Sequence, residues 1–167
     1  MMPPILSFAG MTLPLQQGAL GTVPCAHTDW LHGLAMHNRH LNLAETPTTP
    51  SVQLDHDSGL LLISGVSAPE NANNFYEPIL DWVRNYVESP ATRTVVRFDF
   101  DYFNTASSKM LLKFLTIVKF LSDEGKDISY EWCYSPSDID MLESAEDYAT
   151  LLQIPMKAIP KEATGTA

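Results

Sequence analysis

Apolar and polar positions begin to alternate regularly at Ser51, and the pattern from there onward predicts short strands and longer helices. Val52 and Leu54 alternate with polar neighbours, residues 56–59 have the composition of a tight turn, and residues 60–64 continue as a second strand. Two strands joined by such a turn are typical of a β-hairpin. We therefore expect the folded part of the chain to start with a hairpin.

Two later segments alternate with a period of two, which indicates strands that bury one face. The first places Val96, Phe98, Phe100 and Tyr102 on one face and Arg97, Asp99 and Asp101 on the other. The second, residues 128–134, alternates large apolar or aromatic side chains with polar ones. A sheet covered on both faces would show continuous apolar runs instead, so this sheet is expected to have one apolar and one polar face.

Apolar residues recur at helical spacing in three stretches. These cover about residues 75–88, 105–125 and 137–152, and residues 154–159 then have the features of a short edge strand. The predicted order is β-β-α-β-α-β-α-β. The sequence thus predicts an α/β fold in two layers, a mixed sheet of about five strands with three helices mainly on one face.

Residues 1–50 differ from the rest of the chain because they are rich in Pro, Gly, Thr and His and have no sustained period. Only three of their side chains are ionised: Asp29, Arg39 and Glu45. We expect residues 1–50 to be a disordered or loosely packed N-terminal extension, residues 51–160 to be the folded domain, and residues 161–167 to be a flexible tail. An alternative is that Met36 is the true start of the protein.

The chain has 167 residues and a formal net charge of −10, which restricts its partners. All but two of its 20 acidic side chains follow residue 50. Nucleic acids and anionic membranes attract Lys and Arg, so we expect neither as a partner. Cys25 and Cys133 are too far apart to suggest a disulfide framework, and no segment has the features of a signal peptide or a membrane span. A soluble cytoplasmic protein is the expectation.

The sequence contains none of the residue patterns that are typical of catalysis. It has no Gly-rich phosphate loop, no G-x-S-x-G and no H-E-x-x-H. The histidines of the first 50 residues have neither Cys partners nor i, i+4 spacing: His27, His32, His37 and His40. We therefore expect no enzyme activity, no cofactor and no bound metal.

Two groups of acidic residues leave alternatives open. Asp99 and Asp101 could hold a divalent cation in a small metal-dependent hydrolase, although the polar face of a half-buried strand explains them more simply. A run of acidic residues without basic ones lies further on: Asp138, Asp140, Glu143, Glu146 and Asp147. That run is either a solvated helix face or a docking surface for a basic partner.

The segment 102–109, Tyr-Phe-Asn-Thr-Ala-Ser-Ser-Lys, is the most informative because a strand ends and a helix begins within it. Four polar side chains gather at this helix start: Asn104, Thr105, Ser107 and Ser108. One of them is enough to cap the helix. The helix end also carries a positive partial charge that suits a phosphate. The residues alone leave open whether the segment only caps the helix or is phosphorylated, which would add about −1.5 to −2 charge.

Residues from about 51 to 159 resemble the SiaC family of bacterial regulatory phosphoproteins. The matching stretches are residues 64–65, 69–70, 75–82, 102–109, 132–134 and 138–147. Each stretch is short, but the combination is specific and covers nearly the whole predicted domain.

The resemblance implies a STAS-like fold, similar to that of anti-sigma-factor antagonists, and a non-enzymatic role in partner switching. It implies that Thr105 is phosphorylated by a dedicated serine/threonine kinase and dephosphorylated by a PP2C-type phosphatase. The unphosphorylated form is then expected to bind and activate a diguanylate cyclase or another signalling effector, which raises cyclic di-GMP and favours biofilm formation. The expected partner-binding residues are Tyr102, Asn104, Thr105, Ser107, Ser108 and Lys109. An anti-sigma-factor-antagonist-type module that acts on transcription is the alternative.

Overall fold

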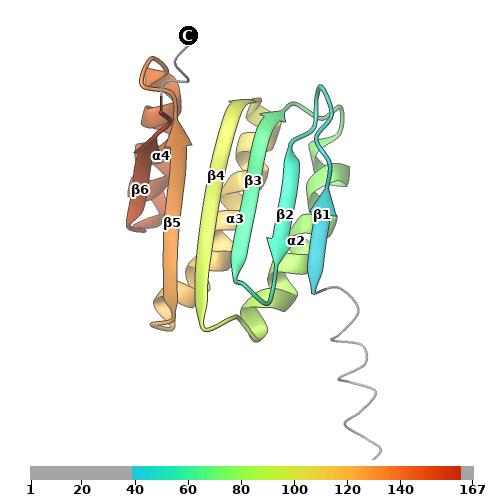
Figure 1. The fold of residues 1–167 in the computed structure, drawn as a ribbon, viewed down its shortest axis with the longest axis vertical. Helices are drawn as coiled ribbons and strands as arrows, with labels where there is room; N and C mark the ends of the chain where they lie inside the picture. Colours follow the sequence, from blue (N-terminus) through green and yellow to red (C-terminus); the bar gives the residue numbers. More distant parts are fainter. Residues whose placement is uncertain (1–38, 163–167) are drawn as a thin grey trace, which may run out of the picture. The chain divides into compact units, whose positions relative to one another are not determined.

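The computed structural model describes residues 39–162, which form a six-stranded sheet with three helices (Figure 1). In chain order, the elements are β1 (His40–Leu43), β2 (Ser51–Asp55), β3 (Leu60–Ser67), α2 (Ala72–Glu88), β4 (Arg93–Phe103), α3 (Thr105–Asp123), β5 (Asp127–Tyr134), α4 (Ile139–Leu152) and β6 (Met156–Pro160). From β2 onward this is the predicted order of strands and helices.

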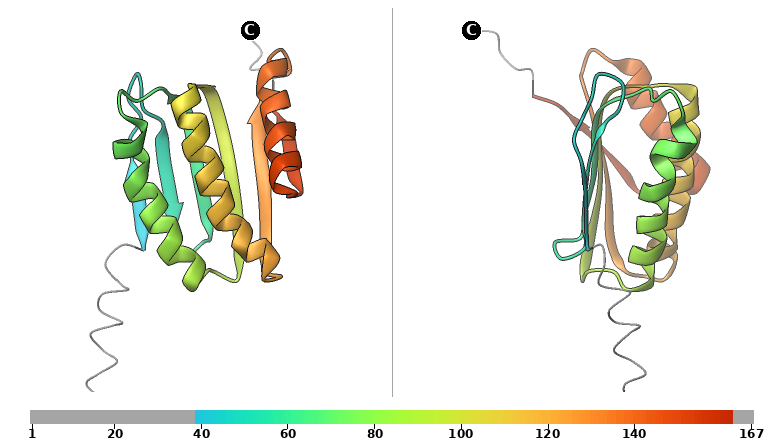
Figure 2. Two further views of the ribbon diagram at one scale, coloured as in Figure 1. Left: turned by 180° about the vertical axis from the view of Figure 1, so that it is seen from behind. Right: turned by 90° about the vertical axis from the view of Figure 1, so that its right-hand side faces the viewer.

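The strands lie in the sheet in the order in which they occur in the chain. β1, β2 and β3 pair antiparallel, whereas β3 to β6 are parallel to one another. A helix connects each parallel pair, and such crossovers are almost always right-handed. Because every crossover steps in the same direction across the sheet, the three helices cover the same face (Figure 2). The predicted two-layer α/β architecture is confirmed.

None of the helices within residues 39–162 has both the length and the apolar character needed to cross a membrane.

The sheet has one strand more than predicted because β1 comes from the segment expected to be a loose extension. Its two leucines pack against the core. They lie opposite the buried residues of β2: Leu41 opposite Leu54 and Leu43 opposite Val52. A strand of four residues contains only two apolar positions, which is too few to produce a recognisable period.

The predicted domain boundary at residue 50 is therefore wrong for residues 40–50, which belong to the sheet and to the loop that enters β2. The expectations for residues 1–38, including the alternative start at Met36, lie outside the described residues. Residues 163–167 lie outside them as well.

A β-bulge in β4 changes the direction of the last side chains of this strand. Gly65 of β3 lies opposite Phe100, but the residue after Gly65 lies opposite Tyr102, which leaves Asp101 as an extra residue. Gly65 adopts a φ of +93°, a conformation that favours glycine, at the position where the register shifts. The bulge turns Tyr102 onto the polar face, where it is 55% exposed, and turns Phe103 toward the core. The expectation that Tyr102 shares a face with Phe100 is wrong, because simple alternation assumes an uninterrupted pleat.

Aromatic side chains fill the core between the sheet and the helices. The ring of Phe98 lies 5.6 Å from that of Phe114 and 5.3 Å from that of Trp132, both in edge-to-face geometry. The Trp132 ring also lies 5.5 Å from that of Tyr148 in α4. Such rings bury large areas and prefer these tilted arrangements. This cluster holds α3 and α4 against β4 and β5.

We expect Phe98→Ala to lower the free energy of unfolding by about 3–5 kcal/mol, because it removes a fully buried ring and leaves a cavity. Phe120→Ala is the matched control, since Phe120 lies on α3 but is 52% exposed, and its loss should change the unfolding free energy by about 0.5 kcal/mol or less. Urea denaturation followed by circular dichroism measures both variants. Equal losses in the two variants would contradict this description of the core.

Candidate functional site

A single residue, Asn104, separates the end of β4 from the start of α3. The end of β3 lies beside this junction because β3 and β4 run parallel. The backbone N–H of Asn104 donates a hydrogen bond to the carbonyl of Ser67, the last residue of β3, at 2.9 Å. The junction is therefore held at the carboxyl edge of the sheet, at the upper end of β4 in Figure 1.

Asn104 is the cap of α3. Its Oδ1 accepts a hydrogen bond from the backbone N–H of Ser107 at 2.8 Å, and its carbonyl accepts one from the backbone N–H of Ser108 at 2.9 Å. Its backbone is extended, with φ −86° and ψ 170°, as is usual for a capping residue. Thr105 is the first residue of the helix, and the cap does not require its hydroxyl.

Ser107 is fully buried and is hydrogen-bonded to the end of β3. Its Oγ accepts a hydrogen bond from Ser67 Oγ at 2.8 Å and donates one to the Ser67 carbonyl at 3.0 Å. Because Ser67 donates its one hydroxyl proton to Ser107, the hydroxyl of Tyr76 is the donor in its 2.6 Å contact with Ser67 Oγ. Burial raises the pKa of Tyr76 to about 12, so this donor keeps its proton at neutral pH. The Ser107 side chain connects α3 to β3 and α2 in the interior, and its binding to a partner stays a prediction.

Ser108 is hydrogen-bonded to α4. The hydroxyl of Tyr148 donates to the carbonyl of Ser108 at 3.0 Å, so Ser108 Oγ is the donor in its 2.9 Å contact with the Tyr148 hydroxyl. Burial raises the pKa of Tyr148, which keeps this hydroxyl protonated. The Ser108 side chain therefore holds two helices together.

Three of the predicted partner-binding residues have exposed side chains: Tyr102, Thr105 and Lys109. Thr105 and Lys109 are four positions apart in α3, so they lie on the same side of the helix, one turn apart. Tyr102 comes from the bulged end of β4. Among the three hydroxyl residues at the start of α3, Thr105 is the exposed one.

Three residues that the sequence reasoning missed complete the junction: Ser67, Tyr76 and Tyr148. Ser67 and Tyr148 are each 40 positions from the serine that they contact, so no local pattern indicates these pairs. The burial of Ser107, in contrast, is indicated by its position in the sequence. Ser107 lies four and seven positions before the buried Leu111 and Phe114, and it therefore continues the apolar stripe of α3.

Asp99 and Asp101 form ion pairs with a lysine near the end of the chain. The Nζ of Lys161 lies 2.6 Å from Asp99 Oδ1 and 3.1 Å from Asp101 Oδ1, and it donates a hydrogen bond to the Phe100 carbonyl at 3.3 Å. Burial alone would lower the pKa of Lys161, but its hydrogen bonds to the two carboxylates outweigh this effect and raise the pKa. An ammonium group between the two carboxylates gives no support to the metal-dependent hydrolase. Lys161 also belongs to the domain, and the prediction that the flexible tail begins there is wrong.

The acidic residues of α4 lie near the junction, because Tyr148 connects this helix to Ser108. The exposed members of the acidic run are Asp140, Glu143, Glu146 and Asp147. Asp138 has a structural role, since its side chain caps α4. Ile139 and Leu151, near the two ends of the helix, are each 65% exposed. A face that combines acidic and apolar side chains is compatible with both the solvated helix and the docking surface, and the docking surface stays a prediction.

Known proteins are similar to this chain in sequence and in fold. Residues 43–161 match the family model described as "SiaC family regulatory phosphoprotein". A curated relative, an uncharacterized protein from Pseudomonas aeruginosa (strain UCBPP-PA14), is 27% identical over 108 residues, which cover 65% of this chain and 86% of the relative.

Solved structures have the same fold. The crystal structure of apo-SiaC from Pseudomonas aeruginosa has a TM-score of 0.67 and 25% identity, and the match covers 72% of this chain and 98% of that one. SiaC in the crystal structure of the diguanylate cyclase SiaD with its activator SiaC, from the same organism, has a TM-score of 0.68 and 25% identity, with 72% and 99% covered. The family model spans most of this chain, including all of the junction, and the chain belongs to the SiaC family of regulatory phosphoproteins.

Proposed function

We propose that this protein is a non-enzymatic phosphorylation switch in which Thr105 controls the binding and activation of a diguanylate cyclase. The observation that carries the proposal is the exposure of Thr105 at a junction where the other hydroxyl groups are engaged in the fold.

The accessibility of each hydroxyl group to a kinase favours Thr105 as the modified residue. A kinase must bring the acceptor hydroxyl next to the γ-phosphate of ATP. Ser107 is fully buried, and Ser108 is half-buried with its hydroxyl bonded to Tyr148. Modification of either serine would require α3 to separate from its neighbours. Thr105 needs no such rearrangement, which supports it as the site.

A phosphate on Thr105 would change the surface and leave the fold intact. Asn104 supplies the cap, so the helix does not lose its N-terminal hydrogen bond. A negative charge in the first turn of a helix is stabilising by about 0.3–1 kcal/mol. Lys109, one turn further along, lies at the i, i+4 position, where it can pair with the phosphate.

The switch would then act on the partner. The exposed surface at the junction includes the Tyr102 ring, the Thr105 hydroxyl and the Lys109 ammonium group. A partner that covers Thr105 would have to desolvate a charged phosphate, which is costly. The phosphate would also pair with Lys109 and remove that cation from the interface. Both effects favour release of the partner on phosphorylation.

A diguanylate cyclase is the proposed partner because one of the similar solved structures contains SiaC as the activator of the diguanylate cyclase SiaD. A dedicated serine/threonine kinase and a PP2C-type phosphatase would add and remove the phosphate, as the family resemblance implies. The acidic face of α4, next to the junction, would contact basic residues of the cyclase.

The first prediction from this proposal concerns the site of phosphorylation. After incubation of the protein with its kinase and ATP, intact mass spectrometry should show one added phosphate in the wild type and none in Thr105→Ala. Thr116→Ala is the matched control, because Thr116 lies on the same helix and is exposed, with its hydroxyl bonded to the Leu112 carbonyl. An unchanged phosphate load in Thr105→Ala would defeat the assignment.

The second prediction concerns the effect of charge. Thr105→Glu should weaken binding to the cyclase by about tenfold or more, which corresponds to about 1.4 kcal/mol. Thr105→Gln is the matched control, since it has nearly the same size and no charge, and it should bind more tightly than Thr105→Glu. Isothermal titration calorimetry measures both affinities. Gating by charge at Thr105 would be excluded by equal affinities of the two variants.

The same two variants test whether the switch leaves the fold intact. The unfolding free energies of Thr105→Glu and Thr105→Gln should differ by about 1 kcal/mol or less, with the glutamate variant the more stable. A much less stable glutamate variant would mean that loss of binding reflects unfolding.

A further inference from the structure

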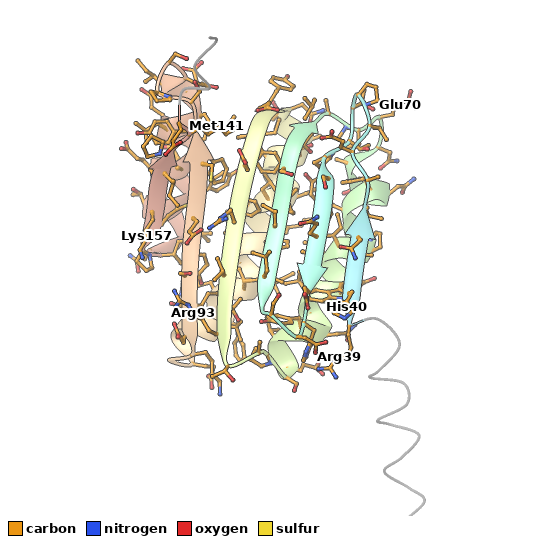
Figure 3. The ribbon with its side chains drawn as sticks, in the orientation of Figure 1. Arg39, His40, Glu70, Arg93, Met141 and Lys157 are labelled. Atoms are coloured by element: carbon orange, nitrogen blue, oxygen red, sulfur yellow. The ribbon has the colours of Figure 1, made fainter. Side chains whose placement is uncertain are left out.

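A second cluster of polar side chains lies at the opposite end of the sheet from Thr105. β3 and β4 run parallel, so the β2–β3 hairpin lies at the start of β4 and Thr105 follows its end. β4 has 11 residues, which separates the two ends by roughly 30 Å or more. His40 begins β1 and lies directly opposite Asp55 at the end of β2, and Asp57 follows in the hairpin turn. Figure 3 labels His40 and the adjacent Arg39 at this end of the sheet.

We propose that His40, Asp55 and Asp57 form a binding site for a transition-metal dication of the zinc class. Each of these residues offers one ligand atom, and the three atoms lie within 4.8 Å of one another. The proposal is independent of the phosphorylation switch, because the two sites share no residue.

The spacing of the ligand atoms suits a small cation. His40 Nδ1 lies 3.1 Å from Asp55 Oδ1, and His40 Nε2 lies 3.5 Å from Asp57 Oδ2. Two ligands that each bind zinc at about 2.0–2.1 Å in tetrahedral geometry are roughly 3.4 Å apart. A metal would bind only one of the two ring nitrogens, and one ring nitrogen and one oxygen of each carboxylate lie within 4.8 Å of one another. The His40 side chain is 50% exposed, so a cation can reach it from solvent.

His56 borders the site in the orientation of a metal ligand. Its Nε2 lies 2.8 Å from the carbonyl of Ser89, which can only accept a hydrogen bond, so the ring proton is on Nε2. Nδ1 then carries the free electron pair and faces the cluster, 3.9 Å from Asp57 Oδ1. In histidines that bind metals, the N–H of the second ring nitrogen commonly donates a hydrogen bond to a backbone carbonyl in this way. His56 Nδ1 therefore lies next to the site, outside the three ligand atoms that lie within 4.8 Å of one another.

The electrostatics of the cluster favour a cation. Asp55 Oδ1 accepts hydrogen bonds from the backbone N–H groups of Asp57 at 2.8 Å and Ser58 at 3.2 Å, which hold this carboxylate in place. Arg39 now forms an ion pair with Asp57 and donates to His56 Nδ1 at 3.3 Å. Its side chain is exposed and can move away when a dication replaces its charge. The imidazole of His40 favours a transition metal over Mg²⁺ or Ca²⁺, which prefer oxygen ligands.

A bound metal would connect β1 to the hairpin. β1 is an edge strand of four residues that contacts only β2 in the sheet, and His40 is its first residue. A bond from the metal to His40 would hold this strand at the point where the chain enters the domain, and it would stabilise the folded state in proportion to metal concentration.

The test is isothermal titration calorimetry of the full chain with zinc chloride. The wild type should bind zinc, and both His40→Gln and Asp57→Asn should weaken one equivalent of binding by about tenfold or more. His32→Gln is the matched control, because His32 is another histidine of the N-terminal segment but lies outside the described residues, and this variant should keep that equivalent. Circular dichroism checks that each variant is folded.

A second measurement separates this site from zinc bound elsewhere on the chain. Zinc should raise the melting temperature of the wild type and of His32→Gln, and it should raise that of His40→Gln and Asp57→Asn less. The proposal is overturned if the wild type binds no zinc, or if folded His40→Gln and Asp57→Asn bind zinc as the wild type does.

Discussion

The direction in which the strands are added determines most of this structure. After β3, every new parallel strand lies on the same side of the previous one. A right-handed crossover then leaves only one face for each connecting helix. The helices of residues 39–162 therefore form one layer that leaves the other face of the sheet uncovered (Figure 2), and the junctions that follow β3, β4 and β5 meet at the carboxyl edge. The neighbourhood of Thr105 is a result of this constraint.

Buried hydrogen bonds make the β4–α3 junction rigid. A hydroxyl group removed from water must find a partner, and Ser107 finds both of its partners in Ser67. Tyr76 completes this chain of hydrogen bonds from α2, and Tyr148 forms a corresponding pair with Ser108 from α4. Two helices, α2 and α4, and the end of β3 thus converge on the first turn of α3. The exposed Thr105 is carried on a fixed support, so a change at this residue alters the surface more than the fold.

The sequence predicted those features that repeat along the chain. The half-buried strands β4 and β5 alternate over many residues, and the apolar stripes of the helices are long, so their existence and order could be read directly. β1 is too short to have a period. The direction of Tyr102 depends on the bulge opposite Gly65, which is a property of two paired strands. The sequence of β4 alone therefore does not indicate the bulge.

The sequence predicted the position of the β4–α3 junction but not the contacts of its side chains. The cluster of polar residues at a helix start is visible in the sequence, as is the family resemblance. Which residue caps the helix and which is buried depends on contacts with Ser67 and Tyr148, each 40 positions from its partner. The cluster around His40 is a similar case, since His40 and Asp55 meet only because β1 and β2 pair in one register.

Lys161 has a practical consequence for work on this domain. It follows β6 directly, and its ammonium group pairs with two carboxylates of β4 on the polar face. A shortened protein that ends at Pro160 would keep every helix and strand of residues 39–162 but would lose the cation that pairs with Asp99 and Asp101. Purification tags and fluorescent fusions at this end should therefore follow Lys161 with a spacer, so that the lysine can still reach β4.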